Sequence, residues 1–290
     1  MLLTLTVSGL VLGCIYGLVA LGYSLIYKAS GLMSFAQGDL MTVGAYLGLT
    51  LYGYLDLPFP LAFAFTAVAM FFLGIVLERF VIRRLRSRDI LPIYVVLATI
   101  AISYILQNSV QLVWGANLLR FPSIFNVATV HLFDRNFQTE SLFTVGISVV
   151  IMVVLQLFMK KSKLGTGMRA SAIDPVAAKA CGISVNLCTG LAWAIAACTA
   201  ALGGVLMSPL YGLLPTLGSR IGTKGFAAAV IGGYGNMYGA IVGGLILGLL
   251  EMLTAGYISS GYKDLCAYTV LIIFLFIRPW GLFNERTIKD

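Results

Sequence analysis

The chain has 290 residues, of which 60% are hydrophobic and only 10% charged, and its mean hydropathy is +0.97. Soluble domains carry about 25% charged residues, so this composition excludes a soluble globular protein. In a soluble protein the net charge of +8 would suggest a nucleic-acid partner. Here the basic residues gather at the ends of apolar segments, which is typical of membrane topology, and we expect no nucleic-acid partner.

Apolar segments follow one another along the whole chain, and most are long enough to cross a bilayer. We predict eight of them, at residues 3–27, 38–55, 58–77, 91–113, 141–159, 187–210, 238–254 and 265–277. A shorter piece at 225–233 is too brief to span and is typical of a half-helix or re-entrant segment. We therefore predict an all-α polytopic membrane protein, a single transmembrane domain over residues 1–290.

Three clusters of basic residues predict the orientation, because loops rich in Lys and Arg stay in the cytoplasm. The clusters are Arg79, Arg83, Arg84, Arg86 and Arg88; Lys160, Lys161, Lys163, Arg169 and Lys179; and Arg278, Arg286 and Lys289. This places the amino terminus and the 114–140 connection outside. The chain then needs an odd number of crossings, so the 225–233 piece must supply part of one, with a break near mid-depth at Gly235 and Asn236.

Two glycine-rich, polar-interrupted segments stand at comparable places, FAQGDLMTVGAYLG at 35–48 and FAAAVIGGYGNMYGAIVGG at 226–244. Each follows a long helix, and the two preceding helices run in opposite directions. Interrupted helices at matching positions in two halves are the best pointer in a sequence to a transport pathway near the midplane. We therefore predict two pseudo-symmetric halves.

Five polar residues are candidates for the translocation pathway: Ser34, Gln37, Asp39, Asn236 and Glu251. The two carboxylates are costly in a membrane, about 2.5–3.5 kcal/mol each on insertion scales, so each needs a partner or a water-filled cavity. They either line the pathway or clasp two helices together. The uncharged residues either bind solute or satisfy backbone groups freed by glycine.

Glycines also recur at four-residue spacing, at Gly9, Gly13 and Gly17 in the first segment and at Gly239, Gly243 and Gly244 with Gly248 near the end. Small residues at this spacing let helices approach closely in lipid. This pattern predicts packing and carries no information on the substrate.

Several kinds of chemistry are unsupported. The five scattered cysteines form no CxxC pair, and the single histidine, His131, lies in a polar loop, so we expect no metal site. No GxxxxGK[ST] phosphate-binding loop is present, so we expect no ATP hydrolysis in this chain. No GxSxG motif is present either.

The cytoplasmic loop at 160–187 contains GTGMRASAIDPVAAKACGIS. A short helix with adjacent small residues Ala177 and Ala178, followed by Gly182, has the spacing of a docking helix that packs closely on a soluble partner. This favours a permease driven by a separate motor subunit.

The run GLVLGCIYGLVALGYSLIYKASGLMSFAQGDLMTVGAYLG, the run GFAAAVIGGYGNMYGAIVGGLILGLLE and the closing RPWGLF resemble the signatures of LivH-type permeases of branched-chain amino acid ABC transporters. The loop resembles that family's version of the ABC coupling motif. Together these matches cover most of the chain in the right order.

The resemblance implies a type II ABC importer-like fold in the bacterial inner membrane. It implies a second, LivM-like permease, two cytoplasmic ATPase subunits that hold ATP and Mg, and an external solute-binding protein. Ala177, Ala178 and Gly182 match the coupling motif, flanked by Arg169 and Asp174. On this basis we expect Ala178→Trp to insert normally but to lose uptake.

Two departures from the family pattern matter. Val176 stands where the general motif has glutamate, and SFAQGD at 34–39 stands where the family commonly has Asn-Phe-Ala-His-Gly-Glu. The second departure leaves a urea or short-amide importer as an alternative substrate class. A secondary transporter with Asp39 or Glu251 as its ion site, or a passive channel, would need no docking helix.

Overall fold

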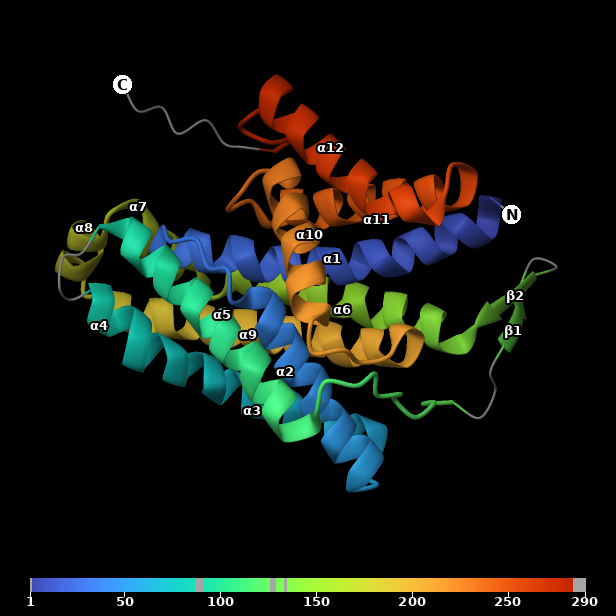
Figure 1. Cartoon of the computed structure of the whole chain (residues 1–290). Coiled ribbons are helices and arrows are strands. Elements are labelled where there is room, and N and C mark those ends of the chain that lie inside the picture. The colour runs from blue at the N-terminus through green and yellow to red at the C-terminus, as the bar shows by residue number, and fades with distance from the viewer. Residues whose placement is uncertain (1, 87–90, 126–128, 133–134, 284–290) are drawn as a thin grey trace.

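The computed structural model describes residues 2–86, 91–125, 129–132 and 135–283 (Figure 1). The long helices are α1 (Leu2–Ser30), α3 (Phe59–Leu77), α5 (Pro92–Trp114), α6 (Thr139–Lys161), α9 (Val185–Tyr211), α11 (Met237–Tyr257) and α12 (Lys263–Ile277). The shorter elements are α2 (Gln37–Leu49), η1 (Thr50–Tyr54), η2 (Glu78–Ile82), α4 (Arg83–Arg86), β1 (Thr129–Leu132), β2 (Arg135–Gln138), α7 (Lys163–Ile173), α8 (Pro175–Ala180), α10 (Leu217–Gly232) and η3 (Ser260–Tyr262).

Seven helical segments in the described part are long and apolar enough to cross a membrane. They contain α1, α3, α5, α6, α9, α11 and α12, which confirms the all-α polytopic fold class. The predicted segment at 38–55 corresponds to α2 and η1 but is not among the seven. Its first turn carries Gln37 and Asp39, which are buried away from lipid and hydrogen-bonded to neighbouring helices.

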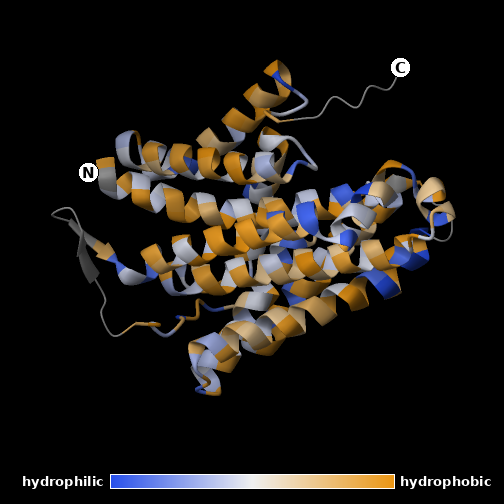
Figure 2. Cartoon of the chain, turned by 180° about the vertical axis from the view of Figure 1, so that it is seen from behind, coloured by the Kyte–Doolittle hydropathy of each residue, from blue (hydrophilic) through white to orange (hydrophobic). Residues whose placement is uncertain are grey.

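Two helices form the centre of the bundle. The most apolar stretch of α9 is 83% buried and that of α1 is 72% buried, against 22% for the segment containing α3 and 6% for that of α12. Small side chains on α9, among them Ala192, Ala196, Ala197, Ala200 and Ala201, are fully buried and let neighbouring helices approach closely. The outer helices carry exposed apolar side chains, among them Phe72 on α3 and Phe276 on α12. Figure 2 shows that apolar residues predominate along the helices.

The predicted glycine spacing serves the contact between α1 and α11, which run antiparallel. A Cβ atom at Gly13 would lie 2.8 Å from Leu245 Cα, and one at Gly248 would lie 2.3 Å from Gly13 N. No larger residue fits at these positions without moving a backbone. The contact brings the first and the eleventh helix together and closes the bundle.

Helix α10 crosses α1 steeply (Figure 1), whereas α1, α6, α9 and α11 run alongside one another. A Cβ at Gly222 would meet Tyr23 Oη at 3.4 Å, and one at Gly225 would meet the Val19 side chain at 2.5 Å. The helix begins at Leu217, eight residues before the predicted start of the broken segment at residue 225. With residues 212–216 it returns the chain from the end at Tyr211 to the end at Asn236, which supplies the crossing that parity required.

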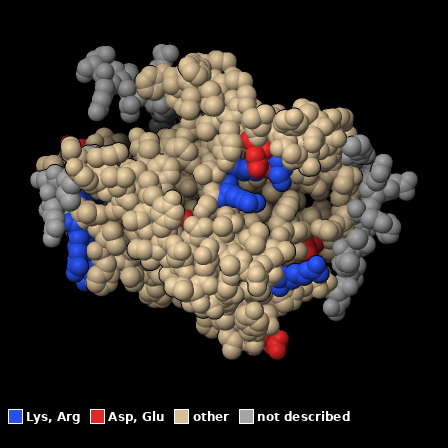
Figure 3. All heavy atoms as spheres, viewed as in Figure 1, with Lys and Arg blue, Asp and Glu red and all other residues tan. Residues whose placement is uncertain are grey.

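The two ends of the bundle differ in charge. Helices α4, α7 and α8 lie at one end, and the amino terminus and the β1–β2 hairpin lie at the other (Figure 1). The first end carries the basic clusters, so we refer to it as the cytoplasmic end and to the opposite one as the outer end. In Figure 3 the surface is mostly uncharged; Lys and Arg lie without acidic neighbours at the left edge, where α4 lies in Figure 1, and beside acidic residues near the centre and on the right. Arg88, Arg286, Lys289 and the side chain of His131 lie outside the described part.

Candidate translocation pathway and coupling helix

Asp39 lines a cavity of about 340 Å³ that opens on the face formed by α5, α10 and α12, where Tyr104 and Tyr268 are exposed. It stands in the first turn of α2, and its side chain is 1% exposed. The hydroxyl of Ser103 on α5 donates to Asp39 Oδ2, and that of Ser219 on α10 donates to Oδ1 at 3.4 Å. Two hydroxyl donors and an adjoining cavity give this carboxylate the environment that an ionisable group needs in a membrane.

The walls of this cavity are of mixed character. Tyr23, Gln107 and Thr223 contribute polar groups, and Phe35 and Leu271 contribute apolar surface. Its helices are α1, α2, α5, α10 and α12, so the cavity lies where α2 and α10 begin. A Cβ at Gly38 would lie 2.1 Å from Gly218 O, so both glycines are needed for α2 and α10 to meet.

Ser34 and Gln37, the two other polar candidates close to Asp39 in the sequence, do not line the Asp39 cavity. Gln37 is fully buried, and its Nε2 donates to Ala196 O on α9 at 2.6 Å, while a Cβ at Gly22 would collide with it. Ser34 is 1% exposed. The Ser34 Oγ and Gln37 Oε1 atoms make no hydrogen bond within the described part of the chain.

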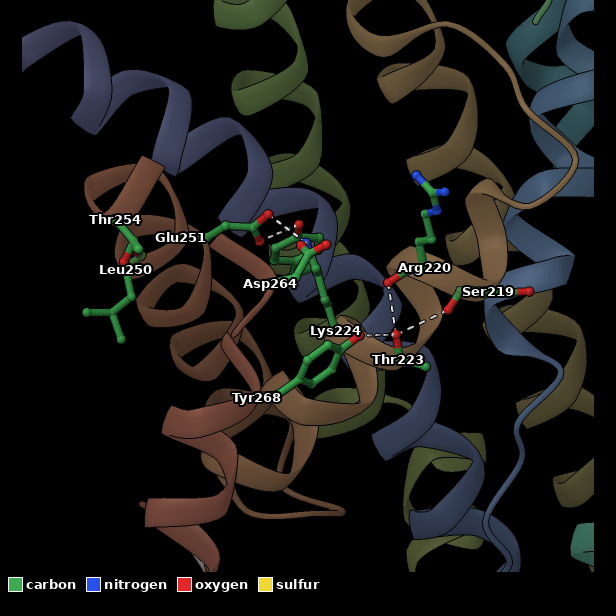
Figure 4. Close-up of polar contacts among 10 residues, drawn as sticks. Ser219, Arg220, Thr223, Lys224, Leu250, Glu251, Thr254, Asp264 and Tyr268 are labelled. Carbon is green, nitrogen blue, oxygen red and sulfur yellow. Dashed lines mark hydrogen bonds and ion pairs between the residues drawn. The ribbon is translucent and has the colours of Figure 1, made fainter. Parts of the chain in front are cut away.

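Glu251 is held in a separate buried ion cluster (Figure 4). Its Oε1 lies 2.6 Å from Lys224 Nζ on α10, and its Oε2 accepts from Tyr16 Oη at 2.8 Å. The same ammonium group lies 2.7 Å from Asp264 Oδ1 on α12. This geometry matches the clasp reading of Glu251, because its charge is neutralised by a lysine that ties α10 to α11 and α12.

Asn236 lies at the cytoplasmic end, not near mid-depth as predicted. It borders a pocket shared with Lys28, Lys160 and Arg169. Its Oδ1 accepts from the backbone N–H groups of Tyr238 and Gly239, so it caps the start of α11, and its Nδ2 donates to Phe283 O at 2.7 Å. The Gly-Asn pair predicted a helix break correctly, but asparagine here serves as an N-cap.

Helix α10 links the cavity to the ion cluster. Ser219 and Thr223 line the cavity, and Lys224, one residue further on, enters the cluster. Thr223 Oγ1 also lies 3.0 Å from Tyr268 Oη on α12. Figure 4 shows Thr223 next to Tyr268 and Lys224 directed toward Asp264 and Glu251. A displacement of α10 therefore moves both sites together.

The cytoplasmic loop folds into two short helices. Ser162 caps α7 by accepting from Gly165 N at 2.9 Å, and Asp174 caps α8 by accepting from Val176 N at 2.8 Å and Ala177 N at 3.0 Å. Pro175 occupies the first position of α8, where its missing N–H has no cost. Gly182 ends α8 with φ of +79°, a conformation that favours glycine.

The exposed face of this loop differs from the predicted one. Ala178 is 4% exposed and packs inside the chain, so it is not available to a partner. Outward-facing side chains are those of Ile173 and Val176, which are 86% and 77% exposed, together with Ala177. The small residue at 178 therefore serves the fold of the loop, and the departure at Val176 stands on its outer surface. Arg169 Nη2 donates to Thr166 Oγ1 at 3.2 Å, and Arg169 borders the Asn236 pocket.

Four residues of these sites were not predicted from the sequence. They are Ser103, Ser219, Lys224 and Asp264. Lys224 carried a readable signal, because a lysine next to an apolar segment needs a carboxylate partner and Glu251 needed a cation. Because the broken segment was predicted to start at residue 225, Lys224 fell one residue outside the predicted segment. No group of three His, Cys, Asp or Glu that could hold a metal occurs in the described part.

Relatives match nearly the whole chain. A family model described as "Branched-chain amino acid transport system / permease component" matches residues 5–275. The chain belongs to this family. LivH of Escherichia coli strain K12, a high-affinity branched-chain amino acid transport system permease protein, is 32% identical over 97% of this permease and 95% of its own length. BraD of Pseudomonas aeruginosa, with the same description, is 31% identical over 98% and 96%.

Solved structures give the same fold. PsaBC from Streptococcus pneumoniae, in complex with Fab, matches with a TM-score of 0.52 at 15% identity and covers 94% of the permease and 91% of that chain. At this identity the likeness concerns the fold alone. The permease is thus a multi-pass protein of the inner membrane, built as the membrane subunit of a transport system.

Proposed function

We propose that this permease translocates branched-chain amino acids as one membrane subunit of an ABC importer. The observation that carries the proposal is full-length similarity, above 30% identity, to permeases described as parts of high-affinity branched-chain amino acid systems. The relatives named above are described as branched-chain amino acid permeases and not as urea or amide permeases, which supports the first substrate class despite the departure at residues 34–39. The pairing of Glu251 with Lys224 also removes one of the two carboxylates that a secondary transporter could use as its ion site.

The proposed transporter contains four further subunits besides this permease. A second, LivM-like permease would form the other half of the pathway, an external binding protein would deliver solute, and two cytoplasmic ATPases would bind ATP and Mg. The exposed face of the α7–α8 loop would seat in a groove of one ATPase, with Ile173, Val176 and Ala177 as its contact. These apolar side chains stand exposed at the cytoplasmic end, where a partner gains by covering them.

The Asp39 cavity is the proposed solute route. A branched-chain amino acid carries an ammonium group, a carboxylate and an apolar side chain. Asp39 supplies a negative charge for the ammonium group, while Phe35 and Leu271 supply apolar wall. The first turn of α10 borders the same cavity, and the start of a broken helix favours an anionic group.

The proposal is tested by reconstituting the transporter purified from its native membrane into vesicles with ATP and Mg inside. Uptake of labelled leucine, urea and acetamide is then measured with the binding protein outside. We expect leucine uptake that requires both ATP and the binding protein. Uptake of urea or acetamide alone would assign the permease to the alternative substrate class, and uptake by the chain without partners would overturn the importer.

A further inference from the structure

A basic pocket of about 660 Å³ opens at the cytoplasmic end, between the α3–η2–α4 segment and the start of α9. Its charged lining residues are Glu78, Arg79, Arg83, Arg84, Arg86 and Lys179. Five cations against one carboxylate leave a strong positive excess. The rule that basic residues gather in the cytoplasm accounts for the charges but not for a cavity around them.

The carboxylate of this pocket, Glu78, is paired with Arg83. Glu78 is 2% exposed, and its Oε2 lies 2.9 Å from Arg83 Nη2 while its Oε1 accepts from Thr189 Oγ1 at 3.1 Å. Arg83 Nη2 also donates to Asn186 O at 3.1 Å. These contacts fix the Arg83 guanidinium on the wall, and the Arg83 charge offsets that of Glu78, so the remaining four cations carry the positive excess of the pocket.

An apolar stripe leads along α3 into this pocket. Its members are spaced three or four residues apart and are all between 46% and 60% exposed: Leu61, Phe65, Val68, Phe72, Val76 and Phe80. This spacing places them on one outward face of the helix. At its end the Arg84 guanidinium lies 5.5 Å above the Phe80 ring, so the stripe and the cations meet at one point.

We propose that this pocket binds the phosphate headgroup of an acidic phospholipid, whose acyl chains lie along the α3 stripe. Arginine binds phosphate oxygens through paired, charge-assisted hydrogen bonds, and a basic pocket beside a membrane helix is a recurring headgroup site. The continuity of the stripe with the pocket favours a lipid over an acidic protein surface. Lys179 belongs to α8, so a bound headgroup would tie the docking helix to α3 and η2.

The test uses the full-length chain in mixed micelles of phosphatidylglycerol and phosphatidylcholine, with retained lipid counted by native mass spectrometry. Arg79→Gln/Arg86→Gln removes two pocket cations. Lys160→Gln/Lys161→Gln removes the same charge at the same end, outside this pocket, and is the matched control. We expect retained phosphatidylglycerol to fall at least about tenfold in the first variant. The control variant should retain as much phosphatidylglycerol as the unmodified protein. The amount of phosphatidylcholine retained should be the same in the unmodified protein and in both variants.

If the first variant does not fold, Arg86→Gln/Lys179→Gln tests the same pocket from both of its sides. Equal retention in pocket and control variants would overturn the proposal, as would equal retention of the two lipids. Capture of inorganic phosphate with no retention of phosphatidylglycerol would assign the pocket to a free anion instead. Complete displacement of the lipid by the partner ATPase would make the pocket a protein-docking surface.

Discussion

Among the predicted pathway residues, Asp39 lines the cavity where α2 and α10 begin, whereas Asn236 borders a pocket at the cytoplasmic end. We expect the charge of Asp39 to matter for transport. Asp39→Asn keeps the size of the side chain and can still pair with Ser103 and Ser219. We therefore expect normal insertion and at least about a tenfold loss of leucine uptake, since one charged hydrogen bond in a buried site contributes roughly 1.5–3 kcal/mol. Glu140→Gln, a carboxylate outside the cavity, should keep full uptake. Loss of folded protein in Asp39→Asn would instead make Asp39 a structural clasp.

The Lys224–Glu251 pair makes a different prediction, because here stability is at stake. Removing one partner leaves a buried charge uncompensated, so Lys224→Met should destabilise the protein by about 3–5 kcal/mol. Lys224→Met/Glu251→Leu should recover much of this loss, because no buried charge is then left unpaired between α10 and α11. Thermal unfolding in detergent measures both. A double variant less stable than the single one would contradict the clasp.

At the scale of elements, substitutions at two neighbouring alanines of α8 should affect different properties, docking at one position and folding at the other. Ala177 is exposed and Ala178 is buried. We expect Ala177→Trp to leave a folded permease that no longer retains its ATPase, and Ala178→Trp to lower the folded yield itself. Size-exclusion chromatography and co-purification distinguish the two. An ATPase that binds Ala177→Trp normally would remove the proposed contact face.

The α1–α11 contact predicts that replacing glycine by alanine changes the stability in opposite directions at two positions. Gly→Ala inside a helix normally stabilises by about 1 kcal/mol. Gly146→Ala on α6 meets nothing within 4 Å and should be neutral or stabilising, whereas a Cβ at Gly248 would lie 2.4 Å from Gly13 Cα. Gly248→Ala should therefore lower the unfolding temperature. Equal shifts for the two variants would show that the helices separate easily.

The sequence predicts elements better than it predicts contacts. Hydrophobic length located the long spans, and the glycine spacing predicted close helix packing. Depth and partner choice were not accessible, since Asn236 looks the same in a sequence whether it caps a helix at the surface or interrupts one at mid-depth. For the same reason Ala178 was assigned to an outer face, because six residues of α8 give too short a pattern to tell inside from outside. Lys224 was missed because the predicted start of the broken segment, residue 225, lies eight residues after the start of α10 and one residue after Lys224.

For the whole molecule, the orientation can be measured directly. Of the described cysteines, Cys181 is exposed, Cys14 and Cys188 are buried, and Cys198 and Cys266 are intermediate. Cys181 follows α8, so a membrane-impermeant thiol reagent should label it in inverted vesicles and not in right-side-out vesicles. Ser260→Cys, at the outer end, should show the opposite pattern in a chain lacking Cys181. Labelling of Cys181 from outside would invert the topology.

The buried ammonium group of Lys224 also has a consequence for biogenesis. Its two counterions lie 27 and 40 residues further along the chain, on helices that leave the ribosome later. Until α11 and α12 have been synthesised, α10 enters the lipid with a lysine that nothing neutralises. The nascent chain must therefore hold α10 at the translocon or in a polar crevice, and nascent chains that end before residue 251 should be substrates for membrane quality control.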